Sequence, residues 1–167
     1  MTVLRIPSND AAAAFPGAPP ARYEDLQELG DVYASASQIE LASECYRRAA
    51  VAAPHRAGPY VGLGLLAMQS DRLDDALRAF QIALRNEPDC AEARGGLAMV
   101  LQRTGRYAEA FDMYLQCLQL DGDNLVALLG LFQTSCQMGT FENIIHYLEV
   151  YLDKHPADTA VLFCLAT

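Results

Sequence analysis

The chain has 167 residues, of which 52% are hydrophobic and 20% are charged, and its formal net charge at pH 7 is −9. This composition is too apolar for a disordered chain, and the sequence has no run of about 18 apolar residues of the kind that spans a membrane. An acidic chain without a block of cations is repelled by phosphates, which argues against nucleic acid as the partner.

The first 22 residues form a Pro- and Ala-rich arm. Pro7, Pro16, Pro19 and Pro20 prevent a continuous helix over this segment. The apolar run at residues 11–14 is shorter than the apolar core of a signal peptide. The five cysteines contain no CxxC pair and are odd in number, which indicates a reducing compartment. We therefore expect a cytoplasmic protein.

From residue 23 onward the sequence repeats itself every 34 residues. Pro54 and Pro88 are one period apart, and Pro156 lies two periods further on. Gly122 occupies the position between them where the period would place a proline. A period of this length indicates a repeat protein rather than an ordinary globular domain. The spacing predicts four repeats and the start of a fifth, at 23–56, 57–90, 91–124, 125–158 and 159–167.

Each repeat is expected to contain two helices joined by a tight turn. Apolar residues recur at helical spacing twice per repeat, and the pattern is interrupted near Ser37, Asp71, Gly105 and Gly139. Where a repeat closes with a proline, that proline is expected to end the second helix. The predicted helices span 23–36, 40–53, 57–70, 74–87, 91–104, 108–121, 125–138 and 142–155.

Eight positions hold residues of the same kind in the first two repeats. They are Leu26, Leu29, Gly30, Tyr33, Ala42, Tyr46, Ala49 and Pro54, and then Tyr60, Leu63, Gly64, Ala67, Ala76, Phe80, Ala83 and Pro88. This pattern, which continues with more substitutions to residue 158, resembles the tetratricopeptide repeat (TPR) family. The resemblance implies an all-α fold, a right-handed superhelical solenoid of antiparallel helix pairs. Partners of this family usually bind its concave surface, which the first helix of each repeat lines.

Small residues mark the places where two helices must approach closely. Gly30, Gly64 and Ala98 provide this space on the first helices. On the second helices an alanine precedes an aromatic residue by four positions, so both lie on one face, and the ring is expected to fill the gap to the next repeat. These pairs are Ala42 with Tyr46, Ala76 with Phe80 and Ala110 with Tyr114.

Given the geometry of the family, nine side chains are expected to line the concave surface: Gln27, Asp31, Val61, Leu65, Met68, Met99, Gln102, Leu129 and Gln133. The middle of this surface is apolar and its N-terminal end is acidic. Family members that hold the acidic C-terminus of a chaperone use a clamp of Lys, Asn and Arg. The equivalent positions here hold no basic residue, so we do not expect capture of a carboxylate. They are Gln27, Asp31, Gly62, Glu92 and Gly96.

An apolar groove with an acidic end suits a peptide or an amphipathic helix with basic flanks. We therefore expect a non-catalytic protein–protein interaction module, an adaptor or scaffold. Two alternatives stay open: the N-terminal TPR region of a larger enzyme such as a glycosyltransferase or methyltransferase, and a chaperone for a secreted protein. It is also open whether Val61, Leu65 and Met68 line a groove or only pack between helices of a tightly curved array.

Both ends of the chain invite a further hypothesis. The arm at 1–22 is expected to dock in the apolar groove of its own or a neighbouring molecule. The incomplete repeat at 159–167 favours a fragment of a longer protein. The alternatives are a capping helix over Ile144, Leu148 and Tyr151, or self-association through this end or through the arm.

No residue pattern predicts catalysis, a cofactor or a metal. Gly62 and Gly64 fit a loose dinucleotide-binding motif, but no strand precedes them. His55, His146 and His155 are too dispersed to share a metal ion. We therefore expect that the chain is not an enzyme.

Overall fold

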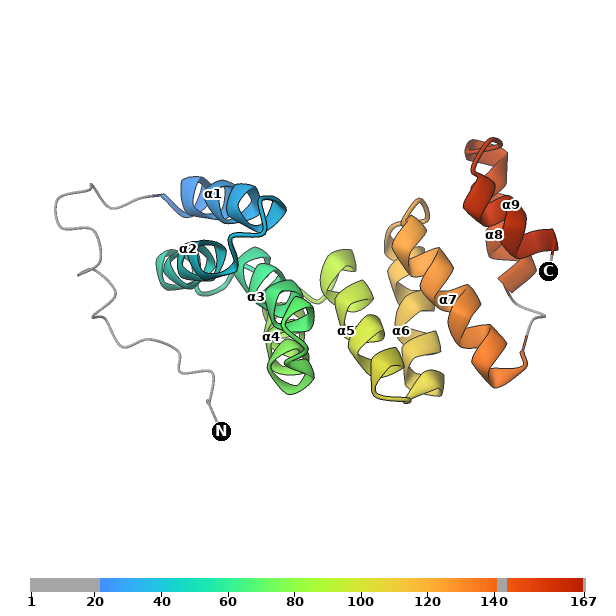
Figure 1. The fold of residues 1–167 in the computed structure, drawn as a ribbon, viewed down its shortest axis with the longest axis horizontal. Helices are drawn as coiled ribbons and strands as arrows, with labels where there is room; N and C mark the ends of the chain where they lie inside the picture. The colour runs from blue at the N-terminus through green and yellow to red at the C-terminus, as the bar shows by residue number, and fades with distance from the viewer. Residues whose placement is uncertain (1–21, 141–143, 167) are drawn as a thin grey trace, which may run out of the picture. The chain divides into compact units, whose positions relative to one another are not determined.

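The computed structural model describes residues 22–140 and 144–166, which fold into α-helices without any strand among them (Figure 1). The predictions about the arm fall on residues 1–21, outside the described part. The helices are α1 (Tyr23–Ser35), α2 (Ile39–Ala52), α3 (Gly58–Gln69), α4 (Leu73–Asn86), α5 (Ala91–Arg103), α6 (Tyr107–Leu120), α7 (Leu125–Met138), α8 (Ile144–Lys154) and α9 (Thr159–Ala166).

The chain divides into two compact halves at the bond between Pro88 and Asp89. In the N-terminal half, α1 packs against α2 and α3 against α4, while α2 and α1 both contact α3. In the C-terminal half, α5 packs against α6, both contact α7, and α7 and α9 both contact α8. Short connections make the paired helices antiparallel. Each half is thus built from stacked helix pairs, the architecture of a helical-repeat solenoid.

The periodicity places the helices accurately. The first seven predicted helices each begin and end within one residue of an observed one. The eighth was predicted at 142–155, and α8 is described over Ile144–Lys154 because residues 141–143 lie outside the described part. Pattern and structure agree closely because each helix buries one stripe of apolar side chains and ends where that stripe is interrupted.

The four interruptions between paired helices are left-handed turns. The backbone φ is 57° at Ser37, 56° at Asp71, 78° at Gly105 and 69° at Gly139. In each turn the next N–H bonds back to a carbonyl five residues earlier, for example Arg106 N to Leu101 O at 2.9 Å. This is the Schellman arrangement, which satisfies the last carbonyls of the first helix and reverses the chain. The predicted tight turns are therefore confirmed.

Aromatic rings of the second helices lie directly on glycines of the first helices. A Cβ atom at Gly30 would come within 2.5 Å of Tyr46 Cε1, and one at Gly64 within 2.7 Å of Phe80 Cε1. The same Tyr46 ring also lies against Gly62 in the next helix pair, at 2.5 Å from a Cβ placed there. The expected close approach of the paired helices is confirmed. The contact of the Tyr46 ring with the next helix pair also requires a glycine at position 62, which the repeat pattern did not identify.

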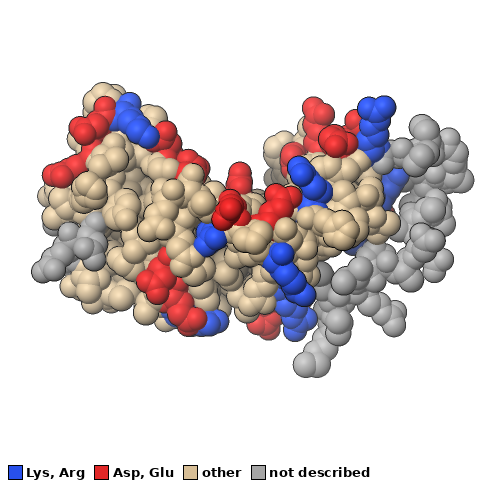
Figure 2. Space-filling model, turned by 180° about the vertical axis from the view of Figure 1, so that it is seen from behind, with Lys and Arg blue, Asp and Glu red and all other residues tan. Residues whose placement is uncertain are grey.

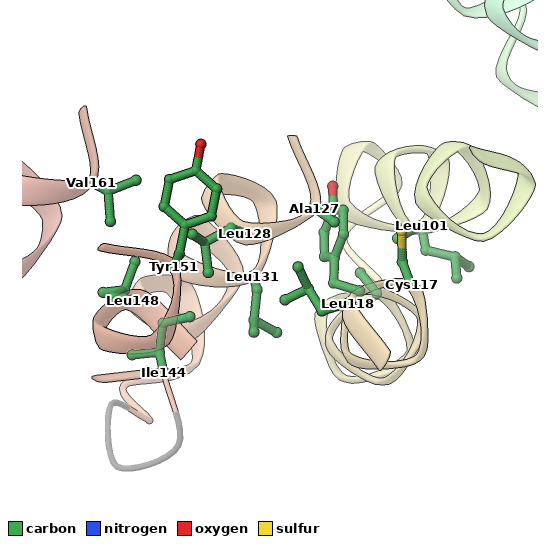
Figure 3. Packing of buried hydrophobic residues seen from close by; sticks show 13 residues of the cluster. Leu101, Cys117, Leu118, Ala127, Leu128, Leu131, Ile144, Leu148, Tyr151 and Val161 are labelled. Atoms are coloured by element: carbon green, nitrogen blue, oxygen red, sulfur yellow. The ribbon is translucent and has the colours of Figure 1, made fainter. Parts of the chain in front are cut away.

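One buried cluster joins the helices of the C-terminal half. Figure 3 shows its side chains, which come from α5 to α9. The Tyr114 ring is buried and lies against Gly130 of α7. Val161 of α9 is fully buried in the same cluster as Ile144, Leu148 and Tyr151 of α8. The last helix is therefore anchored to the preceding helices by Val161, with partly buried Cys164 packed against the same cluster.

The left-handed turns predict a conformational cost for a side chain at Gly105. No atom lies within 4 Å of a Cβ placed there, so Gly105→Ala adds backbone strain without a clash. We expect it to lower the free energy of unfolding by about 1 kcal/mol in urea denaturation.

The matched control is Gly122→Ala. A Cβ at Gly122 would lie at an ordinary distance of 3.7 Å from Leu118 O, and no left-handed φ is required there. We expect a change of less than about 0.5 kcal/mol. Equal stability of the two variants would contradict the assignment of the strain to the turn.

Candidate functional site

The five predicted groove residues of the N-terminal half lie on two helices that touch. Gln27 and Asp31 belong to α1, and Val61, Leu65 and Met68 belong to α3. These five residues are called the N-terminal face below. At the beginning of α3, a Cβ placed on Gly58 would lie 3.1 Å from Gln27 Oε1, so α3 starts directly against α1.

The apolar part of the N-terminal face reaches the surface. Leu65 is 47% exposed, whereas Val61 and Met68 are half-buried. A residue that only packed between helices would be buried, so Leu65 lies outside the core. No charged residue occurs in α3, which leaves Leu65 on an uncharged helix.

The acidic part of the N-terminal face is held in place by hydrogen bonds. Tyr46 donates its hydroxyl to Asp31 Oδ1 at 2.7 Å, and Gln27 Nε2 donates to the same oxygen at 3.2 Å. Burial raises the pKa of Tyr46, and the bond to the Asp31 carboxylate raises it further. Asp31 is therefore a fixed negative charge beside α3, and exposed Glu24, Asp25 and Glu28 add to it on α1.

The four predicted residues of the C-terminal half are called the C-terminal face. Met99 and Gln102 lie on α5, and Leu129 and Gln133 lie on α7. Two of them form a polar relay, since Gln102 Nε2 donates to Gln133 Oε1 at 3.1 Å.

Tyr114 fixes the orientation of this relay. Its hydroxyl donates to Gln102 Oε1 at 2.7 Å. Burial raises the pKa of Tyr114, and nearby Cys117 raises it further. The protonated hydroxyl therefore stays a hydrogen-bond donor at neutral pH.

A cavity of about 400 Å³ opens between α7 and α9. Two predicted residues, Leu129 and Gln133, line it. The further lining residues, which were not predicted, are Phe132, Thr159, Ala160, Phe163 and Cys164. Phe163 follows Leu129 by one 34-residue period, so the repeat pattern contained the signal for this residue.

Within residues 22–140 and 144–166, no group of three or more His, Cys, Asp and Glu side chains is placed to hold a metal ion. No helix in that part of the chain is both long and apolar enough to cross a membrane. On the side of the molecule shown in Figure 2, acidic and basic side chains are interspersed among uncharged ones.

Residues 61–124 match the family model for the tetratricopeptide repeat. Over these residues the chain has the sequence of tetratricopeptide repeats. The chain is 28% identical over 129 residues to the protein CTR9 homolog of Arabidopsis thaliana, a match that covers 77% of this chain and 12% of that relative. The chain therefore spans about an eighth of the length of this relative.

Two solved structures have a fold similar to that of this chain. PilF of Pseudomonas aeruginosa superimposes with a TM-score of 0.78 at 21% identity, over 86% of this chain and 66% of that one. The first TPR domain of Spaghetti (RPAP3), bound to the HSP90 peptide SRMEEVD, superimposes with a TM-score of 0.66 at 17% identity, over 75% of this chain and all of that one. TPR domains generally serve protein–protein interaction.

The hydrogen bond between Tyr46 and Asp31 predicts a measurable coupling. Tyr46→Phe removes a donor to a charged acceptor at 2.7 Å, and we expect a loss of about 1.5 to 2 kcal/mol in the free energy of unfolding. In a double-mutant cycle with Asp31→Ala, the coupling energy should be at least about 1 kcal/mol.

Tyr60→Phe is the control for this loss. Its hydroxyl lies 3.5 Å from Pro54 O, at the limit of a hydrogen bond, so we expect a loss below about 0.5 kcal/mol. If the two tyrosine variants lose the same stability, Asp31 is not held by Tyr46 in the way described.

Proposed function

We propose that this chain is a non-catalytic interaction module that binds a peptide or amphipathic helix of another protein on its N-terminal face. The observation that carries the proposal is the exposed Leu65 on the uncharged helix α3, beside an acidic α1. The partner contributes an apolar side chain to Leu65 and basic residues to α1.

Two physical effects support this pairing. Leu65, with the half-buried Val61 and Met68, offers apolar area, and burial of about 100 Å² of such area contributes roughly 2.5 kcal/mol. The carboxylate of Asp31 and the exposed acids of α1 attract Lys and Arg, which speeds encounter and selects partners by charge. Because Tyr46 and Gln27 hold Asp31, little side-chain entropy is lost on binding.

The same residues argue for a peptide different from the one bound by the TPR domain of Spaghetti. Its peptide, SRMEEVD, ends in acidic residues. In this chain the equivalent clamp positions include Asp31, whose charge would repel such a peptide. They also include Gly62, where a side chain would clash with the Tyr46 ring. The geometry therefore favours a basic partner over an acidic one.

We extend the proposal to the C-terminal face, where Met99 and Leu129 offer apolar contact. The paired amides of Gln102 and Gln133 provide hydrogen bonds to a peptide backbone. We propose that this activity takes place in a reducing compartment, the cytoplasm, because the five cysteines are odd in number and contain no CxxC pair.

The test is selection from a library of displayed peptides, followed by fluorescence anisotropy with the selected sequences. We expect peptides with apolar residues at helical spacing and Lys or Arg on both flanks, bound more weakly as salt rises. Leu65→Asp should raise the dissociation constant at least about tenfold, because a charge replaces the apolar contact.

Val51→Asp is the matched control, because Val51 is 48% exposed on α2 and is not part of the N-terminal face. It should bind the same peptides as tightly as the unmodified chain. Selected peptides with acidic ends, or equal binding by Leu65→Asp, would refute the proposal.

A further inference from the structure

The cavity between α7 and α9 opens where the ring packing of the earlier repeats is interrupted. One period earlier, the Tyr114 ring of α6 lies against Gly130 of α7. The same two repeat positions hold Leu148 of α8 and Cys164 of α9. A leucine side chain fills less space than a tyrosine ring, and Cys164 lines the cavity. The cavity thus accompanies a change in the residues that join successive helix pairs.

The cavity lies on the side of α9 that faces the preceding repeat. Cys164 has the repeat position of Gly130, which contacts a ring of the preceding helix pair. The position that contacts the second helix of the same pair is a different one, as Gly64 shows against Phe80. In α9 that position is Ala166, which does not line the cavity. A helix packed on α9 as α4 packs on α3 would therefore contact Ala166 and not the cavity.

The lining of the cavity is largely apolar and contains two aromatic rings. Phe132 and Leu129 of α7 are half-buried, and Phe163 of α9 is 69% exposed. Neither α7 nor α9 contains Asp, Glu, Lys or Arg. The volume of about 400 Å³ falls within the range of ligand-binding sites. These features suit an uncharged occupant that can pack against aromatic rings.

One polar group of the lining is oriented from outside the cavity. The Tyr114 hydroxyl donates to Gln102 Oε1 at 2.7 Å, and Gln102 Nε2 donates to Gln133 Oε1 at 3.1 Å. The carboxamide oxygen of Gln133 is thereby engaged, so its nitrogen, with two N–H groups, is the end of this relay. Gln133 lines the cavity and can donate to a carbonyl of an occupant.

We propose that this cavity binds an aromatic side chain of the partner peptide, whose backbone carbonyl accepts a hydrogen bond from Gln133 Nε2. An aromatic occupant gains apolar burial and ring contacts with Phe132 and Phe163. The inference rests on the proposed function, because the aromatic residue belongs to the peptide. It adds a requirement that the N-terminal face does not impose, since the basic flanks of the peptide find no acid in α7 or α9.

The experiment uses N-acetyltryptophanamide, an uncharged compound with one indole ring and two carbonyl groups. The chain contains no tryptophan, so the indole emission reports on the compound alone. When the 167-residue chain is titrated into it, we expect a blue shift that saturates with a dissociation constant of about 1 mM or lower.

Two variants of α9 locate the binding site. Ala160→Phe fills the cavity and should weaken binding at least about tenfold, and Phe163→Ala removes one ring and should weaken it at least about fivefold. Their matched controls are Ala166→Phe and Leu162→Ala, because both residues are exposed on α9 and do not line the cavity. The controls should bind like the unmodified chain. All four replaced side chains are exposed, and circular dichroism should show that the variants stay folded.

Gln133→Leu tests the hydrogen bond separately from the apolar contact. It should weaken binding of N-acetyltryptophanamide about fivefold, and it should leave binding of 3-methylindole, which has no carbonyl group, unchanged. Gln137→Leu is the control, since Gln137 is exposed on the same helix outside the cavity. An equal effect of Gln133→Leu on both compounds would contradict the role of its amide.

The inference is overturned if the emission does not shift, or if Ala160→Phe binds as tightly as Ala166→Phe. Leu65→Asp should bind N-acetyltryptophanamide like the unmodified chain, because Leu65 lies on α3. Selected peptides that bind the N-terminal face without any effect of Ala160→Phe would overturn this inference and leave the proposed function standing. Binding of N-acetyltryptophanamide that Ala160→Phe abolishes would support the cavity even if Leu65→Asp failed to weaken peptide binding.

Discussion

The fold depends on aromatic rings that pack directly against glycines of neighbouring helices. Tyr46 contacts Gly30 in its own helix pair and Gly62 in the next one, and Tyr114 lies against Gly130 of the following pair. A ring buried on both sides contributes much apolar contact, but only if no side chain occupies the space that it needs. One side chain thus holds two helix pairs together, and Tyr114, two 34-residue periods after Tyr46, makes the same kind of contact within the C-terminal half.

The same contact shapes the candidate binding surface. Because Tyr46 fills the space beside α1 and α3, its hydroxyl emerges at Asp31 and fixes that carboxylate. Tyr114 is placed in the same way in the C-terminal half, and its hydroxyl orients Gln102. The rings that pack the repeats therefore also place the polar groups of the surface. Some apolar side chains of the first helices, such as Leu65 and Phe163, are not covered by this packing and remain exposed.

The sequence predicted the helices, the tight turns between paired helices and the close approach at Gly30 and Gly64, because each follows from a local or strictly periodic pattern. It also predicted that each ring fills the gap to the next repeat, as Tyr46 and Tyr114 do. It did not predict that this contact requires glycines at positions 62 and 130, because the space between successive helix pairs depends on how they stack. The pairing of Gln102 with Gln133 depends on rotamers of side chains 31 residues apart. The cavity beside α9 was missed although the period points from Leu129 to Phe163.

Stability of Gly62→Ala in urea denaturation tests the central role of the ring contact most directly. A methyl group there would come within 2.5 Å of Tyr46 Cζ, so we predict a loss of about 2 kcal/mol despite the better helix propensity of alanine. Gly95→Ala, whose Cβ would lie 3.5 Å from Cys117 Sγ, should be neutral or stabilising. A Gly62→Ala variant as stable as Gly95→Ala would contradict the account.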